Sequence, residues 1–196
     1  KPLLLKGARQ TGKTYLLKKF GSDAYDRVFY FNFEEEPAMD TFFERNLKPT
    51  RILNELSIYS KAEIHPETDL VIFDEIQVSG RALNALKYFQ EEAPAYHIVA
   101  AGSLLSAKLS RSGSFPVGKV NFLNLYPMTF LEFLDAVGFS RYRQLLEDID
   151  HFTPLSEILH KDLIDQNLRP GCRPIGRDGW ASGRYSGARH PYFQRV

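Results

Sequence analysis

Cysteine is almost missing from this chain of 196 residues, and long apolar segments are missing altogether. The single cysteine, Cys172, excludes an intramolecular disulfide framework and a zinc site built from several cysteines. No apolar run approaches the ~20 residues that span a bilayer. No signal peptide precedes the first apolar segment, so we expect a reducing, cytoplasmic setting without membrane attachment.

Net charge is also nearly absent, and the total of +1 gives no whole-chain argument for nucleic acid as a partner. The total hides an asymmetry, because residues 168–196 carry six arginines and one acid, whereas the first 167 residues carry 19 basic and 23 acidic side chains. The apolar residues of this tail follow neither a helical nor a strand period. We interpret the Gly/Arg-rich segment 168–196 as disordered or as an out-of-frame translation.

What the chain does contain is a regular alternation of strands and helices. Strands are predicted at 1–6, 28–33, 69–73, 96–101 and 119–125. Helices are predicted at 13–20, 37–45, 49–60, 80–92, 129–137, 140–149 and 154–167. This alternation predicts an α/β fold with a mostly parallel sheet covered on both faces. We expect a core at 1–127, a helical extension at 128–167 and the tail at 168–196.

Local signals support several of these helices. Pro37 and Pro49 suit first-turn positions. Thr129 and Glu132 have the spacing of a capping box. Most of the 15 Phe and 10 Tyr lie within apolar runs, where core packing is the default interpretation.

The strongest motif lies where the first predicted strand meets the first helix, and it fits G-x-x-x-x-G-K-[ST]. Its glycines let the backbone wrap around phosphates, Lys13 would reach the β- and γ-phosphates, and the Thr14 hydroxyl would bind Mg²⁺. A chance glycine-rich turn is the alternative, which the strand before and the helix after disfavour. The predicted nucleotide-binding residues are Gly7, Ala8, Arg9, Gln10, Thr11, Gly12, Lys13, Thr14 and Tyr15.

A second motif is the acidic pair Asp74 and Glu75 after the apolar run at 70–73. An acid at the tip of a buried strand can hold Mg²⁺ beside a phosphate loop, which is the function predicted for Asp74. Glu75 can polarise the water that attacks the γ-phosphate. An ordinary polar strand end is the alternative, and the upstream phosphate loop makes it less favoured.

Ser103 ends the next predicted strand, where ligands of parallel sheets lie. It could be a polar sensor of the γ-phosphate or the N-cap of a helix at 104–109. Lys108 and Arg111 follow as weak candidates for an arginine finger, with solvated loop charges as the favoured alternative. Arg9, Gln10 and Gln77 are interpreted as positioning or surface residues, and no histidine pair has the spacing of a metal site.

Together these motifs resemble those of AAA+ P-loop ATPases, and more narrowly a bacterial and archaeal family in which this domain precedes a C-terminal domain of unknown function. The resemblance covers roughly 1–165 and rests on residues 7–14, 73–77, 101–105, 114–118 and 125–134. It implies the strand order 5-1-4-3-2 and the stated roles of Lys13, Thr14, Asp74, Glu75 and Ser103. The sequence differs from the family in lacking its N-terminal helical segment and, from residue 168 on, its Gly-Gly-Met-Pro turn.

The sequence therefore predicts binding of ATP and Mg²⁺ and Mg²⁺-dependent hydrolysis, with a homo-oligomer or an unknown protein as partner. A nucleotide-dependent switch with little turnover is the first alternative. A P-loop phosphotransferase is the second, and the adjacent acids at 74 and 75 speak against it. Nucleic-acid binding through the tail is the least favoured, because the composition of the tail does not look like the product of natural selection.

Overall fold

The computed structural model describes residues 1–103, 118–148, 156–159 and 161. The chain divides into two compact units, Lys1–Tyr126 (unit 1) and Pro127–Val196 (unit 2). Unit 1 contains the sheet and the predicted phosphate loop, and unit 2 contains short helices.

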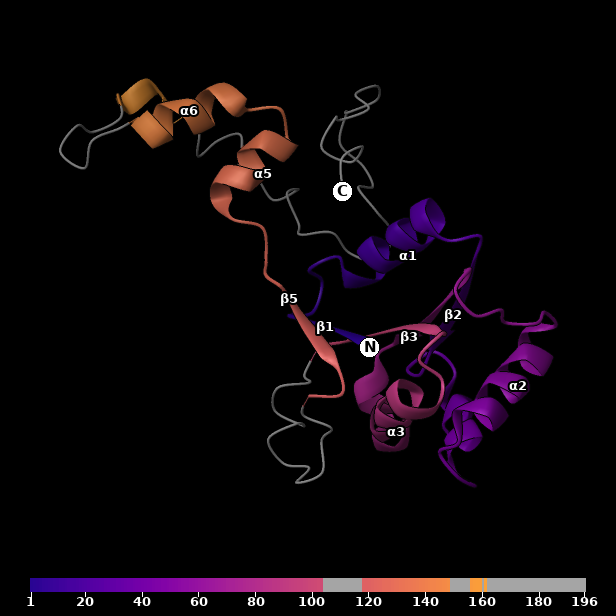
Figure 1. Cartoon of the computed structure of the whole chain (residues 1–196). Coiled ribbons are helices and arrows are strands. Elements are labelled where there is room, and N and C mark those ends of the chain that lie inside the picture. Colours follow the sequence, from indigo (N-terminus) through magenta and orange to yellow (C-terminus); the bar gives the residue numbers. More distant parts are fainter. Residues whose placement is uncertain (104–117, 149–155, 160, 162–196) are drawn as a thin grey trace. The chain divides into compact units, whose positions relative to one another are not determined.

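Unit 1 is built around a parallel sheet of five strands (Figure 1). The strands are β1 (Leu3–Gly7), β2 (Arg27–Asn32), β3 (Asp69–Asp74), β4 (His97–Gly102) and β5 (Asn121–Leu125). Their order is β2-β3-β4-β1-β5, and each neighbouring pair is parallel. The order confirms the arrangement implied by the resemblance. It brings the carboxyl ends of β1, β3 and β4 to one edge of the sheet.

Helices cover both faces of this sheet (Figure 1). On one face lies α1 (Lys13–Ala24), and on the other lie α2 (Pro49–Ser60) and α3 (Gly80–Glu92). All six residues of β3 are buried, as expected for a central strand whose apolar run is continuous. The predicted bounds of α2 and α3 agree with the structure.

The larger of two apolar clusters lies on the α2–α3 face. Phe73 is buried in it, and its ring lies 5.9–6.1 Å, between centroids, from those of Phe31, Phe33, Phe43 and Phe89. Such aromatic pairs contribute about 0.5–1.5 kcal/mol each beyond the area they bury. The smaller cluster packs Leu17 of α1 against the opposite face.

The helix predicted at 37–45 is a 3₁₀ helix, η1 (Pro37–Phe43), rather than an α-helix. Its backbone hydrogen bonds span three residues, as from Met39 N to Glu36 O (3.0 Å). The Thr41 hydroxyl also donates to the carbonyl three residues earlier, that of Ala38 (2.7 Å). These short-range bonds give the tighter turn, and Pro37 occupies its first turn as predicted. A second 3₁₀ helix, η2 (Ile76–Val78), follows β3.

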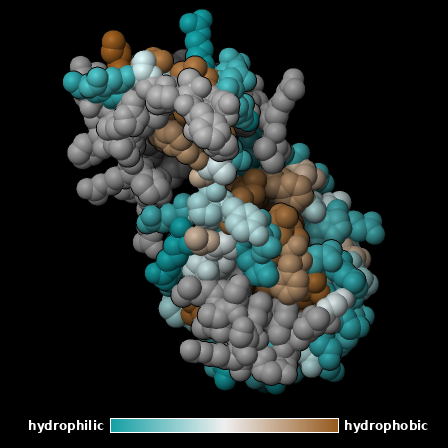
Figure 2. Space-filling view, turned by 90° about the vertical axis from the view of Figure 1, so that its left-hand side faces the viewer, coloured by the Kyte–Doolittle hydropathy of each residue, from teal (hydrophilic) through white to brown (hydrophobic). Residues whose placement is uncertain are grey.

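At the edge of the sheet, β5 exposes apolar side chains. Phe122 is 41% exposed, Leu123 49% and the following Tyr126 75%. Figure 2 faces this side of unit 1 and shows apolar surface gathered there. The Lys6 ammonium lies 4.3 Å from the centroid of the Phe122 ring, so a cation partly covers the strand.

Unit 2 contains α5 (Phe130–Ala136) and α6 (Ser140–Asp148). The predicted capping box is present: Thr129 Oγ1 accepts from Glu132 N (3.2 Å), and Glu132 Oε2 accepts from Thr129 N (2.7 Å). Arg143 of α6 pairs with Asp135 of α5 and with Glu147. Most of the helix predicted at 154–167 and the whole tail at 168–196 lie outside the described residues. No described helix is long and apolar enough to cross a membrane.

Candidate nucleotide-binding site

The turn from β1 into α1 contains the predicted glycine-rich loop. Gly12, which caps α1, has φ 88°, and Gln10 has φ 63°. A Cβ atom on Gly7 would lie 2.3 Å from the carbonyl oxygen of Leu125 on β5. Position 7 therefore requires glycine so that β1 and β5 can pair, whereas position 12 favours glycine for its left-handed backbone.

The Lys13 ammonium group turns back into this loop. Its Nζ donates to the carbonyl oxygens of Gly7 (3.1 Å) and Ala8 (2.6 Å), and the residue is 6% exposed. Burial lowers the pKa of Lys13, while the charges of Glu75 and Asp74 oppose that shift. Both acceptors are neutral carbonyls, and an anionic phosphate would be a stronger partner for the same ammonium.

Thr14, in the first turn of α1, meets Asp74 at the end of β3. The Thr14 hydroxyl donates to Asp74 Oδ2 at 2.6 Å, and the Glu75 amide donates to Asp74 Oδ1 at 2.9 Å. Hydroxyl and carboxylate oxygens are the hard donors that Mg²⁺ takes, together with water and phosphate oxygens. No group of three or more His, Cys, Asp or Glu suited to a metal occurs among the described residues. This donor set fits a magnesium ion that arrives with a nucleotide.

Glu75 follows Asp74 in a left-handed conformation, with φ 50° and ψ 36°. Its carboxylate accepts a hydrogen bond from Nε2 of Gln77, a residue only 7% exposed. A left-handed backbone is uncommon outside glycine, and such strain is often found at functional sites. Gln77, interpreted from the sequence as a positioning residue, contacts the predicted catalytic acid.

Ser103 directly follows Gly102, the last residue of β4. Its Oγ is buried and has no hydrogen-bond partner among residues 1–103 and the other described segments. A buried hydroxyl normally has a partner, so Ser103 retains the capacity to bind one. The helix predicted at 104–109, Lys108 and Arg111 lie outside the described residues. Tyr15, the last predicted nucleotide contact, is 55% exposed on α1.

Sequence reasoning missed two polar residues of this site, Tyr30 and Asn32 of β2. The Tyr30 hydroxyl donates to Asp74 Oδ2 (2.9 Å), and Asn32 Nδ2 donates to the Tyr30 oxygen (3.3 Å). Burial and then the Asp74 charge raise the pKa of Tyr30 above its ordinary value. The alternation of side chains along a strand places positions 30 and 32 on one face, and this pattern could have pointed to both residues. Tyr30 was instead interpreted as a core residue, because it lies in an apolar run rich in aromatics.

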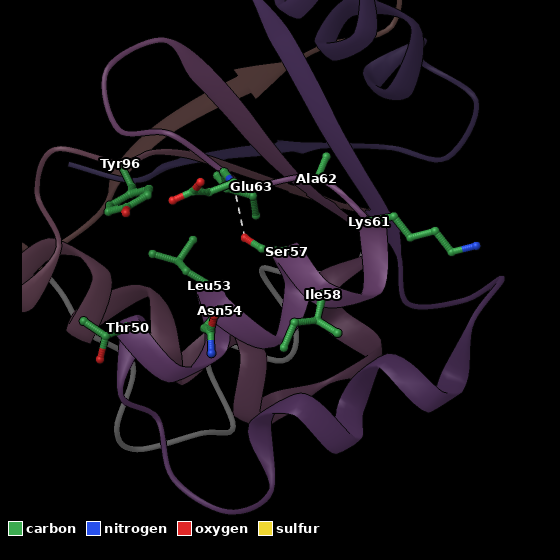
Figure 3. Close-up of a pocket in the computed structure, with 10 residues that line it drawn as sticks. Thr50, Leu53, Asn54, Ser57, Ile58, Lys61, Ala62, Glu63 and Tyr96 are labelled. Atoms are coloured by element: carbon green, nitrogen blue, oxygen red, sulfur yellow. Dashed lines mark hydrogen bonds between the residues drawn. The ribbon is translucent and has the colours of Figure 1, made fainter.

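A hollow of about 510 Å³ lies beside α2, at the end of the sheet where β3 and β4 begin (Figure 3). Leu53 and Ser57 of α2 line it, as do Ile64 and Tyr96, which precede β3 and β4. Since these strands are parallel, the hollow lies at their amino ends, a strand length away from the phosphate loop. The hollow is therefore separate from the candidate nucleotide site.

Three features together define the P-loop NTPase class. They are a parallel sheet of this order, a glycine-rich loop leading into Lys13 and Thr14, and Asp74 at the end of β3, one strand removed from β1. A family model described as an AAA domain matches residues 1–134. The chain belongs to this AAA domain family. It is thus, in general terms, a nucleotide-binding domain of ATPase type.

Solved structures similar to the chain include a variant of RuvB from Thermotoga maritima. The two are 19% identical with a TM-score of 0.41, and the match covers 74% of this chain and 43% of that one. The chain thus spans less than half the length of the RuvB chain it matches. No curated protein matches the sequence.

Proposed function

We propose that this domain binds ATP together with Mg²⁺ in the loop between β1 and α1 and hydrolyses the terminal phosphoanhydride bond. The observation that carries the proposal is the contact of Thr14 with Asp74. These residues are 60 positions apart in the sequence, yet their oxygens lie 2.6 Å apart beside the glycine-rich loop. A hydroxyl and a carboxylate in this arrangement suit a Mg²⁺ ion shared with nucleotide phosphates.

Binding would rest on the loop, residues 7–15. Lys13 would exchange the carbonyls of Gly7 and Ala8 for phosphate oxygens, which are charged and therefore stronger acceptors. The first-turn amides of α1 and the partial positive charge of that helix end favour the same anion. In this arrangement the loop binds the phosphates, and groups outside the loop would bind the base of the nucleotide.

Thr14 and Asp74 would hold the Mg²⁺ ion, which neutralises phosphate charge when it is bound. The carboxylate of Glu75 would accept a proton from the attacking water and align it, the function of a general base. The Ser103 hydroxyl, buried and without a partner in the described part of the chain, would donate to the terminal phosphate. These roles divide binding, metal retention and water activation among separate side chains.

A second candidate is a nucleotide-dependent switch with little turnover. One observation favours it: the Glu75 carboxylate is already engaged by Gln77 in a left-handed turn of the backbone. In that state the carboxylate is less available to a water molecule. Single-turnover hydrolysis of bound ATP separates the two candidates, because a switch retains ATP over many hours and an ATPase releases phosphate.

We infer that the chain is part of the bacterial and archaeal group in which the ATPase domain precedes a C-terminal domain of unknown function. The segment at 125–134, which carries that resemblance, lies within the matched residues 1–134. A partner protein or a second copy of the chain would then respond to the binding and hydrolysis of ATP.

The proposal is tested by ATP binding to the parent chain and to Lys13→Ala. The substitution removes a buried charge that bonds only to carbonyls of the loop, and Lys13 belongs to neither apolar cluster, so the fold should persist. We expect affinity to fall by about 100-fold or more, since bonds to charged groups contribute about 1.5–3 kcal/mol each.

Lys19→Ala is the matched control for Lys13→Ala. Lys19 belongs to the same helix, pairs with Asp23 at 2.6 Å and is 35% exposed. We expect parental affinity from this variant, and circular dichroism should show that both variants keep their helices. Equal ATP affinity of Lys13→Ala and the parent chain would refute the phosphate-loop assignment.

A further inference from the structure

We propose that Tyr30 of β2 is a positioning residue that holds the Asp74 carboxylate in the orientation that receives the magnesium–nucleotide complex. The inference rests on the proposed function and extends it to a strand that carries none of the motif residues. Tyr30 itself would touch neither the metal nor the nucleotide, so its effect passes through Asp74.

The carboxylate of Asp74 is held from several sides. Asp74 is 1% exposed, and its carboxylate receives three donors, one from α1, one from β2 and one from the residue after β3. Thr14 Oγ1 of α1 and Tyr30 Oη of β2 both donate to Oδ2, at 2.6 and 2.9 Å, and the Glu75 amide donates to Oδ1 at 2.9 Å. Of the two side-chain donors, Thr14 is itself a proposed metal ligand. Tyr30 is therefore the donor whose sole function at this carboxylate is to orient it.

The direction of the Tyr30 hydrogen bond is set by Asn32. Oδ1 of Asn32 accepts from the amides of Glu34 (2.9 Å) and Glu35 (3.2 Å), which fixes the orientation of its amide group. Nδ2 then donates to the phenol oxygen of Tyr30 (3.3 Å). Since that oxygen already accepts a hydrogen bond from Asn32, its single proton is directed to Asp74.

The ring of Tyr30 is held as well. The register pairs Tyr30 with Ile72 and Asn32 with Asp74, so all four lie on the α1 face of the sheet. The Lys18 ammonium of α1 lies 3.7 Å from the centroid of the Tyr30 ring. This cation–π contact fixes the ring against α1, and the hydroxyl at its tip reaches the neighbouring strand.

The experiment titrates a fluorescent ATP analogue into the full chain at a series of Mg²⁺ concentrations and in EDTA. Tyr30→Phe keeps the ring and its contact with Lys18 and removes only the hydroxyl. We expect the Mg²⁺ concentration at half-maximal enhancement of affinity to rise about tenfold, the lower end of the effect of such outer partners. Affinity in EDTA should stay within about twofold of the parent, because the loop itself is unchanged.

Tyr25→Phe is the matched control. Tyr25 packs on the same face, against the rings of Phe20 and His97, and its hydroxyl makes no hydrogen bond within the described residues. We expect its Mg²⁺ dependence to equal that of the parent. Loss of folded structure in Tyr30→Phe but not in Tyr25→Phe would assign the bond to stability and overturn the positioning role.

A double-mutant cycle with Asp74→Ala tests whether Tyr30 acts through Asp74. In that background we expect no further change from Tyr30→Phe, whereas additive losses would overturn the inference. Equal Mg²⁺ dependence of Tyr30→Phe and the parent would overturn it alone, with the proposed function intact. A parent chain that binds no ATP analogue with Mg²⁺ would overturn both.

Discussion

Asp74 and Glu75 are neighbours in the sequence and differ sharply in their surroundings. Asp74 is 1% exposed and has donors at both of its oxygens, so its carboxylate is fixed. Glu75 lies one residue on, beyond the end of the strand, with a left-handed backbone and a carboxylate that accepts a hydrogen bond from Gln77. A fixed carboxylate suits a metal site, whereas one beyond the strand end can turn toward water. Two identical functional groups thus suit different tasks.

This difference is tested by Glu75→Gln. The substitution is nearly isosteric, so the Mg²⁺ site at Asp74 should survive and ATP should bind about as well as in the parent. Hydrolysis should slow by roughly 10²–10⁴-fold, or about 3–5 kcal/mol of barrier, because the variant lacks the carboxylate that accepts the proton. Single-turnover hydrolysis measures this rate.

Asp74→Asn is the companion variant. It should weaken Mg²⁺-dependent ATP binding itself rather than the rate of the bound state. A Glu75→Gln chain that hydrolyses ATP as fast as the parent would remove Glu75 from the mechanism and favour the switch.

At the scale of the element, the fit of α1 against the sheet depends on a glycine. A Cβ on Gly21 would lie 2.6 Å from Cγ2 of Val28 and 3.2 Å from Cδ2 of Leu70. Val28 is β-branched and stiff at χ1, so it has little freedom to move away. This close approach helps to set how near α1 lies to β2 and β3, and hence where its first turn, with Thr14, meets Asp74.

Gly21→Ala should therefore destabilise the chain despite the better helix propensity of alanine. Propensity favours Ala by about 1 kcal/mol, and overpacking costs about 1–3 kcal/mol, so we expect a net loss of about 1 kcal/mol. Urea denaturation measures it. Val28→Ala added to Gly21→Ala should restore part of the loss by making room.

Gly80→Ala is the control for this pair, because a Cβ at Gly80, the first residue of α3, has nothing within 4 Å. It should leave stability unchanged or raise it slightly. Equal changes in stability from Gly21→Ala and Gly80→Ala would show that the packing of α1 does not depend on Gly21.

At the scale of the whole molecule, unit 1 contains the sheet and both apolar clusters. The clusters run from Leu3 to Leu125, which lies one residue before the unit ends at Tyr126. The last strand, β5, is necessary to this unit because it pairs with β1 along its whole length, from Leu3 to Gly7. A chain that ends after β5 keeps all five strands of the sheet described here.

We therefore expect residues 1–126 to fold on their own, with a cooperative thermal transition, and deletion of 168–196 to leave the body folded. A chain that ends at Gly118 is the control. It loses β5 and the buried Val120, and it should melt at a lower temperature or remain unfolded. Circular dichroism during heating compares the three chains. A non-cooperative transition in 1–126 would show that unit 2 is required for the fold.

The sequence by itself determined the features that depend on neighbours along the chain. The apolar run of β3, the helical spacing in α2 and α3, and the capping box at Thr129 were predicted from local patterns and agree with the structure. The proposed phosphate loop rests on the same kind of local signal, because its motif is contained in eight consecutive residues. A helix was predicted at 37–45, and the structure has a 3₁₀ helix there, over Pro37–Phe43, a type that the sequence pattern did not specify.

Only the tertiary structure decided which residues outside the motifs meet the site or set the packing of its elements. Tyr30 and Asp74 are 44 positions apart, and their contact depends on the parallel register of β2 with β3. The sequence carries no local sign of that register, so the tyrosine looked like any other core aromatic. The same holds for Gly21, whose fit against Val28 follows from how α1 packs on the sheet. The spacing of side chains along the chain determines the helices and strands. The parallel arrangement of the strands then brings the residues of the candidate site together.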